Sequence, residues 1–186
     1  HWYVDDAGNP QPVCEPLPDS RLQAAVHVDG LIWTADLKAA LECAEKTGRP
    51  ILLAFDSIVD TNARLNDRVY HDPHVRREMK KCVLVKLFVE RVPDEYYRQK
   101  PTNHQALEDG QLNREVASEN FGTVQQPLYA VVRVTSDDCR TVGVYDEALI
   151  TDRARFARFL RDPARAQSPG WLEAAFHKFQ QFRKPD

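Results

Sequence analysis

The sequence predicts an α/β domain in which a central mixed sheet is flanked by helices. A short, continuous apolar run at 51–55 is typical of a strand that is buried on both faces of a sheet, and the run at 82–89, which is apolar except for Lys86, predicts a second strong strand. A helical pattern lies between these runs, which indicates a strand–helix–strand unit with parallel strands. Two further apolar stretches, at 128–134 and 141–145, flank a polar turn at 136–138, which favours an antiparallel hairpin. The sheet is therefore expected to be mixed.

Helices are expected around these strands. The first begins behind a capping residue, Thr34 or Asp36, and ends at Gly48, because apolar residues recur between them at helical spacing. The second helix follows the first buried strand, and the dipeptide Asp72-Pro73 restarts or kinks it. A polar insertion and three further helices follow, at 91–110, 111–121, 151–161 and 170–183.

The chain divides into three parts. Residues 1–30 form a proline-rich arm, and we expect this arm to be irregular because proline opposes both helix and central strand. Residues 31–165 form the domain, and residues 166–186 form a C-terminal amphipathic helix. The apolar side of that helix either packs on its own domain or faces another protein. The chain begins at His1 rather than at methionine, which we interpret as processing or trimming.

Composition excludes two broad classes of function. The net charge of −3 argues against a general nucleic-acid binder. No apolar run approaches the roughly 20 residues that a membrane span needs, so no direct span is expected. Charge is uneven, since residues 151–186 hold eight basic and four acidic side chains. This basic end is either an ordinary solvated surface or a docking site for a partner.

Several local matches, in a fixed order, carry a resemblance to a known family. The matching segments are 36–41, 47–55, 69–75, 83–89, 121–122, 126–129 and 144–150. Taken together, they resemble the C-terminal thioredoxin-like domain of DsbD-type thiol:disulfide interchange proteins, within the thioredoxin-like superfamily. The resemblance covers roughly 33–162 and implies a thioredoxin-like fold for that part of the chain.

The resemblance fails at the catalytic motif of that family. Its members carry a CxxC after the first strand, where a helix N-terminus favours the thiolate and the second cysteine resolves the mixed disulfide. The matching stretch of this chain lies within 59–63, is one residue shorter and contains no cysteine. This departure argues against an ordinary thiol–disulfide enzyme. The cysteines of the chain are Cys14, Cys43, Cys82 and Cys139, and no two are closer than 29 residues.

A polar loop replaces the cysteine motif and is the candidate binding site. It is expected at the carboxyl edge of the sheet, where open α/β sheets place their ligands. The resemblance adds a cis-proline at Pro127, beside which family members pair with client chains. Plain helix capping by the loop and plain shaping of the strand entry by Pro127 remain as alternatives. The candidate residues are Asp56, Ser57, Asp60, Thr61, Asn62, Gln126, Pro127 and Tyr129.

The cysteines offer one further hypothesis. Cys43 lies about 120° from the apolar stripe of its helix, so it can face the arm, and a Cys14–Cys43 disulfide would pin the arm to the domain. Under the resemblance, Cys82 and Cys139 lie on opposite flanks of the sheet and do not pair. His71 and His74 have a metal-like spacing, but no third ligand is evident nearby. We therefore expect neither a metal nor a cofactor.

These observations predict a redox-inactive, thioredoxin-like domain that acts as a protein-binding or structural subunit. The expected partner is another protein, and the resemblance extends this expectation to a membrane-associated complex. It also suggests a periplasmic or otherwise extracytoplasmic location. The alternative is a thiol–disulfide oxidoreductase that uses a non-standard cysteine, with Cys14 on the arm as the candidate.

Overall fold

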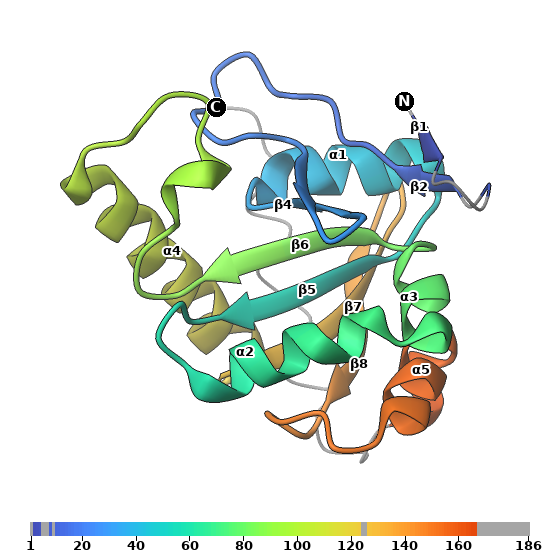
Figure 1. Cartoon of the computed structure of the whole chain (residues 1–186). Helices are drawn as coiled ribbons and strands as arrows, with labels where there is room; N and C mark the ends of the chain where they lie inside the picture. Colours follow the sequence, from blue (N-terminus) through green and yellow to red (C-terminus); the bar gives the residue numbers. More distant parts are fainter. Residues whose placement is uncertain (1, 5–7, 9, 124–125, 167–186) are drawn as a thin grey trace.

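The computed structural model describes residues 2–4, 8, 10–123 and 126–166, and these form a mixed sheet covered by helices (Figure 1). The six-stranded sheet has the order β3-β4-β6-β5-β7-β8. β4, β6 and β5 are parallel, whereas β3, β7 and β8 each run antiparallel to their neighbours. The predicted fold class is confirmed. The strands are β3 (Val26–Val28), β4 (Leu31–Thr34), β5 (Ile51–Asp56), β6 (Val83–Phe88), β7 (Leu128–Val134) and β8 (Cys139–Tyr145).

The two central strands form because every side chain in them is buried. β5 and β6 pair in parallel from Ile51 opposite Val83 to Asp56 opposite Phe88. Side chains alternate along β5, so that one set faces each layer of helices. Ile51, Leu53 and Phe55 pack in one hydrophobic cluster with α1 and α4, whereas Leu52 and Ala54 pack in the other with α3 and α5. Continuous apolar runs of this kind therefore require helices on both faces.

The helices begin at capping residues that the sequence supplies. Asp36, Asp60, Asp72 and Asp152 each accept hydrogen bonds from N–H groups of the first helical turn. Pro73 follows Asp72 and starts α3, as predicted for a restart at this dipeptide. The α-helices are α1 (Leu37–Thr47), α2 (Thr61–Asp67), α3 (Pro73–Met79), α4 (Asn103–Phe121) and α5 (Arg153–Arg161). The 3₁₀ helices are η1 (Arg68–His71), η2 (Asp94–Tyr96) and η3 (Pro163–Ala166).

The arm is more ordered than predicted. It contains a two-stranded ribbon of β1 (Trp2–Val4) and β2 (Pro10–Pro12), followed by β3, so the expected irregular structure is limited chiefly to 13–25. Pro10 and Pro12 lie two residues apart, and their missing N–H groups therefore fall on one side of the strand. A two-stranded ribbon can leave that side without a partner, so the prolines are tolerated.

The sequence also missed β4 and the first two turns of α4. The helix begins at Asn103, behind a capping box made by Thr102 and Gln105, and not at 111. Gly110 lies inside the helix, where the backbone of Glu90 passes so closely that a Cβ would overlap it. The helix expected at 170–183 lies outside the described residues. Within the described part of the chain, no helix combines the length and apolar character of a membrane span.

Candidate functional site

The polar loop and Pro127 lie side by side at the carboxyl edge of the sheet. β5 ends at Asp56, and the loop at 57–60 leads directly into α2. β7 begins directly after Pro127 and pairs with β5 so that Leu128 lies opposite Phe55. The Gln126–Pro127 peptide bond is cis. The topology thus brings the two halves of the predicted site together, as Figure 1 shows for the ends of β5 and β7.

The carboxylate of Asp60 caps the start of α2. The Asp60 side chain accepts hydrogen bonds from the N–H groups of Asn62 at 2.6 Å and Ala63 at 3.2 Å. Thr61 is exposed and Asn62 is half-buried. Of the alternatives for Asp60, capping is therefore the role that the structure shows directly.

Asp56 and Ser57 are both buried, and their polar atoms are already engaged. Asp56 Oδ2 lies 3.2 Å from Lys86 Nζ, and Asp56 Oδ1 accepts a hydrogen bond from the Ser57 N–H at 2.8 Å. Burial raises the pKa of Asp56, against the opposing effect of Lys86. Ser57 Oγ donates to Glu90 Oε2 at 3.0 Å. These two side chains stabilise the end of β5 and leave no free carboxylate for a ligand.

Lys86 is the centre of this buried charge cluster. Its ammonium group lies 3.2 Å from Asp67 Oδ1 as well as from Asp56. The rings of Trp33 and Tyr70 lie 5.1 and 5.8 Å from the same nitrogen, which adds cation–π attraction. A single lysine on β6 therefore contacts side chains of β5, α2 and the neighbouring strand β4.

Tyr129 was predicted as a binding residue, but its side chain is fully buried. Its hydroxyl accepts a hydrogen bond from Asn66 Nδ2 at 2.9 Å and lies 2.9 Å from the Tyr70 hydroxyl. Asn66 also donates to Ala148 O and accepts from the Ile150 N–H. This network fastens α2 to β7 and to the segment after β8. The Tyr129 side chain is thus used within the fold, because both faces of β7 are covered by helices, and a binding role at this position stays a prediction.

The exposed part of the loop is apolar. Ile58 is 45% exposed and Val59 is 68% exposed, and Leu65 on the first turns of α2 is also exposed. We call these three residues the loop patch. The sequence analysis missed them because the loop as a whole is polar. The signal that could have found them is the pair Ile58-Val59, which interrupts an otherwise polar stretch between a buried strand and a helix cap.

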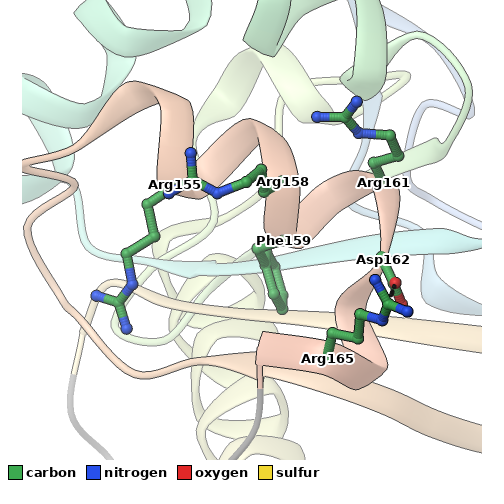
Figure 2. A pocket seen from close by; sticks show the side chains of 6 residues that line it. All are labelled: Arg155, Arg158, Phe159, Arg161, Asp162 and Arg165. Atoms are coloured by element: carbon green, nitrogen blue, oxygen red, sulfur yellow. Dashed lines mark ion pairs between the residues drawn. The ribbon is translucent and has the colours of Figure 1, made fainter.

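The basic end of the domain forms a second candidate surface. A cavity of about 730 Å³ lies against α5 and η3. Arg155 is engaged by Asp146 and Glu147, and Arg165 by Asp162. Figure 2 shows the guanidinium groups of Arg155 and Arg161 pointing in different directions, so the arginines do not converge on one ligand position. The residues that line the cavity are Arg155, Arg158, Phe159, Arg161, Asp162 and Arg165.

The remaining candidates are a metal site and the cysteine pair. His71 faces Asp29 at 3.6 Å, and the described residues contain no group of three side chains that could hold a metal ion. Cys14 and Cys43 are buried as thiols, and a hydrogen bond joins their side chains. The expectation that Cys43 faces the arm is confirmed, whereas the predicted disulfide between the pair stays a prediction.

Comparison with known proteins supports the fold and nothing finer. The structure is similar to the solution structure of a thioredoxin from Thermus thermophilus, with a TM-score of 0.51 and 22% sequence identity. The match covers 69% of this chain and 83% of that thioredoxin. No protein-family model matches the sequence, and no curated protein matches it either. The chain therefore has the thioredoxin-like fold.

Proposed function

We propose that this chain is a thioredoxin-like domain that is redox-inactive at its loop, catalyses no thiol–disulfide exchange there and binds another protein through the loop patch. The observation that carries the proposal is the composition of the loop between β5 and α2. Its polar side chains are used within the fold, whereas Ile58 and Val59 are left exposed. Exposed apolar side chains that adjoin one another are typical of surfaces that a partner covers.

The absence of redox chemistry at the loop follows from the side chains that occupy it. Thiol–disulfide exchange requires a thiolate, and neither a carboxylate nor a hydroxyl nor an amide can replace it. Asp60 caps α2 at the position where a helix N-terminus would otherwise activate a thiol. The loop is therefore built as a contact surface and not as a reaction centre.

The proposal also includes the cellular location of the domain and the assembly to which it belongs. The similarity of the sequence to the C-terminal domain of DsbD-type proteins supports a location outside the cytoplasm and a place in a larger, membrane-associated assembly. The partner would then be a protein that presents an apolar segment to the loop patch.

Site-specific photo-crosslinking in the cells that produce the protein tests this proposal. A photoreactive phenylalanine analogue is placed at Val59, and the matched control carries it at Leu112, which is 56% exposed on α4. We expect one dominant crosslinked species from position 59 that is lost when Ile58→Asp is added. Equal crosslinking from both positions, or no effect of Ile58→Asp, would contradict a specific surface at the loop.

The alternative, an oxidoreductase based on Cys14, has less support. Cys14 is 6% exposed, and its hydrogen bond to Cys43 together with burial raises the pKa of its thiol. A buried, protonated thiol is a poor nucleophile. Catalytic exchange at Cys14 would therefore require the arm to open in every cycle.

A further inference from the structure

We propose that Cys14 and Cys43 are a thiol–disulfide redox couple, which a low-molecular-weight disulfide of the glutathione type oxidises to a bond that fastens the arm to α1. This site lies where α1 ends and β5 begins, at the opposite end of β5 from the loop patch. The inference is therefore independent of the proposed function, and either can fail without the other.

The first argument is the position of the two sulfur atoms. Cys14 follows β2 on the arm, and Cys43 lies in the last part of α1. Both side chains belong to the same hydrophobic cluster, with exposures of 6% and 7%. A side-chain hydrogen bond joins the two thiols. The fold therefore holds the two thiols against each other.

The second argument is that the arm is anchored on both sides of Cys14. The Gln11 side chain donates to Ile32 O at 2.7 Å and accepts from the Ile32 N–H at 3.0 Å. After Cys14, Glu15 lies 3.6 Å from Lys46 on α1. The Gln11 contacts hold the arm three residues before Cys14, and the exposed Glu15–Lys46 pair shows that the arm lies against α1 directly after it. Oxidation therefore needs no large movement of the arm.

The third argument concerns access. A small cavity of about 80 Å³ lies between the arm and α1 and reaches Cys43 but not Cys14. Trp2, Val13 and Glu15 line it from the arm, and Lys46 lines it from the helix. The hydrogen bond with Cys14 and the charge of Lys46 lower the pKa of Cys43, which favours its thiolate. Cys43 is thus the thiol that meets an incoming disulfide first.

The reaction consists of two exchanges. The Cys43 thiolate attacks one sulfur of the incoming disulfide, forms a mixed disulfide and releases the first thiolate, which takes up a proton. Cys14 then loses its proton to solvent and attacks the Cys43 sulfur, and the second thiolate leaves and is protonated. The two protein thiols are oxidised by two electrons in total, and the small disulfide is reduced to two thiols.

The chain carries its own negative control. Cys82 is fully buried, and burial raises its pKa to about 12. Cys139 begins β8, and strands β5 and β7 separate that strand from β6. These two cysteines are therefore expected to stay reduced under conditions that oxidise the pair on the arm and α1.

The experiment equilibrates the purified full chain in buffers of increasing oxidised-to-reduced glutathione ratio. The samples are quenched with acid and alkylated under denaturing conditions, and the peptides are mapped by mass spectrometry. We expect a Cys14–Cys43 crosslink, with Cys82 and Cys139 alkylated, and a melting temperature higher by roughly 5–10 °C in the oxidised form. Full alkylation of Cys14 and Cys43 at the highest ratio, or a crosslink to Cys82 or Cys139, would overturn the proposal.

Two single variants test the order of attack. In Cys14→Ser, a glutathione adduct should accumulate on Cys43, and the gain in melting temperature should disappear. In Cys43→Ser, Cys14 should remain without an adduct because the cavity does not reach it. An adduct on Cys14 but none on Cys43 would overturn the assignment of Cys43 as the attacking thiol.

Discussion

The two ends of strand β5 are built from different chemistry. At the carboxyl end, carboxylates, an amide, tyrosine hydroxyls and Lys86 form a buried polar network, and the loop above it contains no sulfur. At the amino end, the chain places Cys14 and Cys43 in contact between the arm and α1. The comparison teaches that a thioredoxin-like scaffold can carry a buried polar network without thiols at the carboxyl edge of its sheet, while two of its thiols lie between a peripheral segment and the first helix.

The largest expected effect comes from removing the central charge of the carboxyl end. Lys86→Met leaves Asp56 buried without its cation and should lower the free energy of unfolding by about 3–5 kcal/mol. The matched control at the amino end is Lys46→Met, whose ion pairs with Glu15 and Glu42 are exposed and should contribute less than about 0.5 kcal/mol. Urea denaturation measures both, and equal effects would contradict the contrast between the two ends.

The cost of Lys86→Met should depend on pH. The pKa of Asp56 is raised in the folded protein above its ordinary value of 3.8, so ionisation of this carboxyl costs stability as the pH rises through the folded pKa. Without Lys86 this cost grows, and the destabilisation should be larger at about pH 7.5 than at about pH 4.5. The double variant Asp56→Asn/Lys86→Met should lose this dependence. A destabilisation that does not change with pH would show that the Asp56 charge is not its cause.

The next largest effect is expected from removing the Asn66 amide, which belongs to the same polar network. Asn66→Ala removes three hydrogen bonds, to the Tyr129 hydroxyl, Ala148 O and the Ile150 N–H, in a buried site. Leaving these groups without partners should cost about 2–4 kcal/mol, read from denaturant midpoints. Asn62→Ala, one turn earlier and half-buried, is the control with an effect under about 0.5 kcal/mol. Similar losses in the two variants would count against the network.

A strand or helix could be predicted from the sequence where a short stretch of neighbouring residues carries its pattern. The buried strands at 51–55 and 82–89 were predictable because the first run is wholly apolar and the second is apolar except for Lys86, and such runs need helices on both faces. The restart at Asp72-Pro73 was predictable because it rests on capping and on the fixed φ of proline. Strand β4 was not predictable, since its four residues are all buried and show neither the alternation of a half-exposed strand nor helical spacing.

The candidate site was predicted in position but only partly in chemistry. Order along the chain placed the loop and Pro127 at one edge, which the register between β5 and β7 confirms. The burial of Tyr129 and the pairing of Asp56 with Lys86 depend on which helices cover the sheet, and one sequence does not give that packing. The contact between Cys14 and Cys43 was accessible because the angular offset of Cys43 on its helix is a local property.

The smallest effect is expected from removing the Asp60 cap of α2, which stands near the carboxyl end of β5 where related enzymes carry a thiol. Asp60→Ala removes the acceptor for two N–H groups of α2 and should lower the free energy of unfolding by about 1 kcal/mol. Asp60→Asn keeps an acceptor oxygen and should recover most of that loss. Thermal denaturation compares the two, and a neutral Asp60→Ala would mean that the carboxylate is not held for capping.

Reduction of insulin by dithiothreitol, followed as turbidity, tests the central claim most directly. The full chain, added at catalytic concentration, should leave the rate equal to that of dithiothreitol alone, because the loop at 57–60 offers no thiol and Cys14 is buried. The pair Cys14 and Cys43 should not change this outcome, since it joins the arm to α1 and does not face a protein substrate. A clear acceleration that disappears in Cys14→Ser or Cys43→Ser would contradict the account and make the protein a thiol–disulfide enzyme.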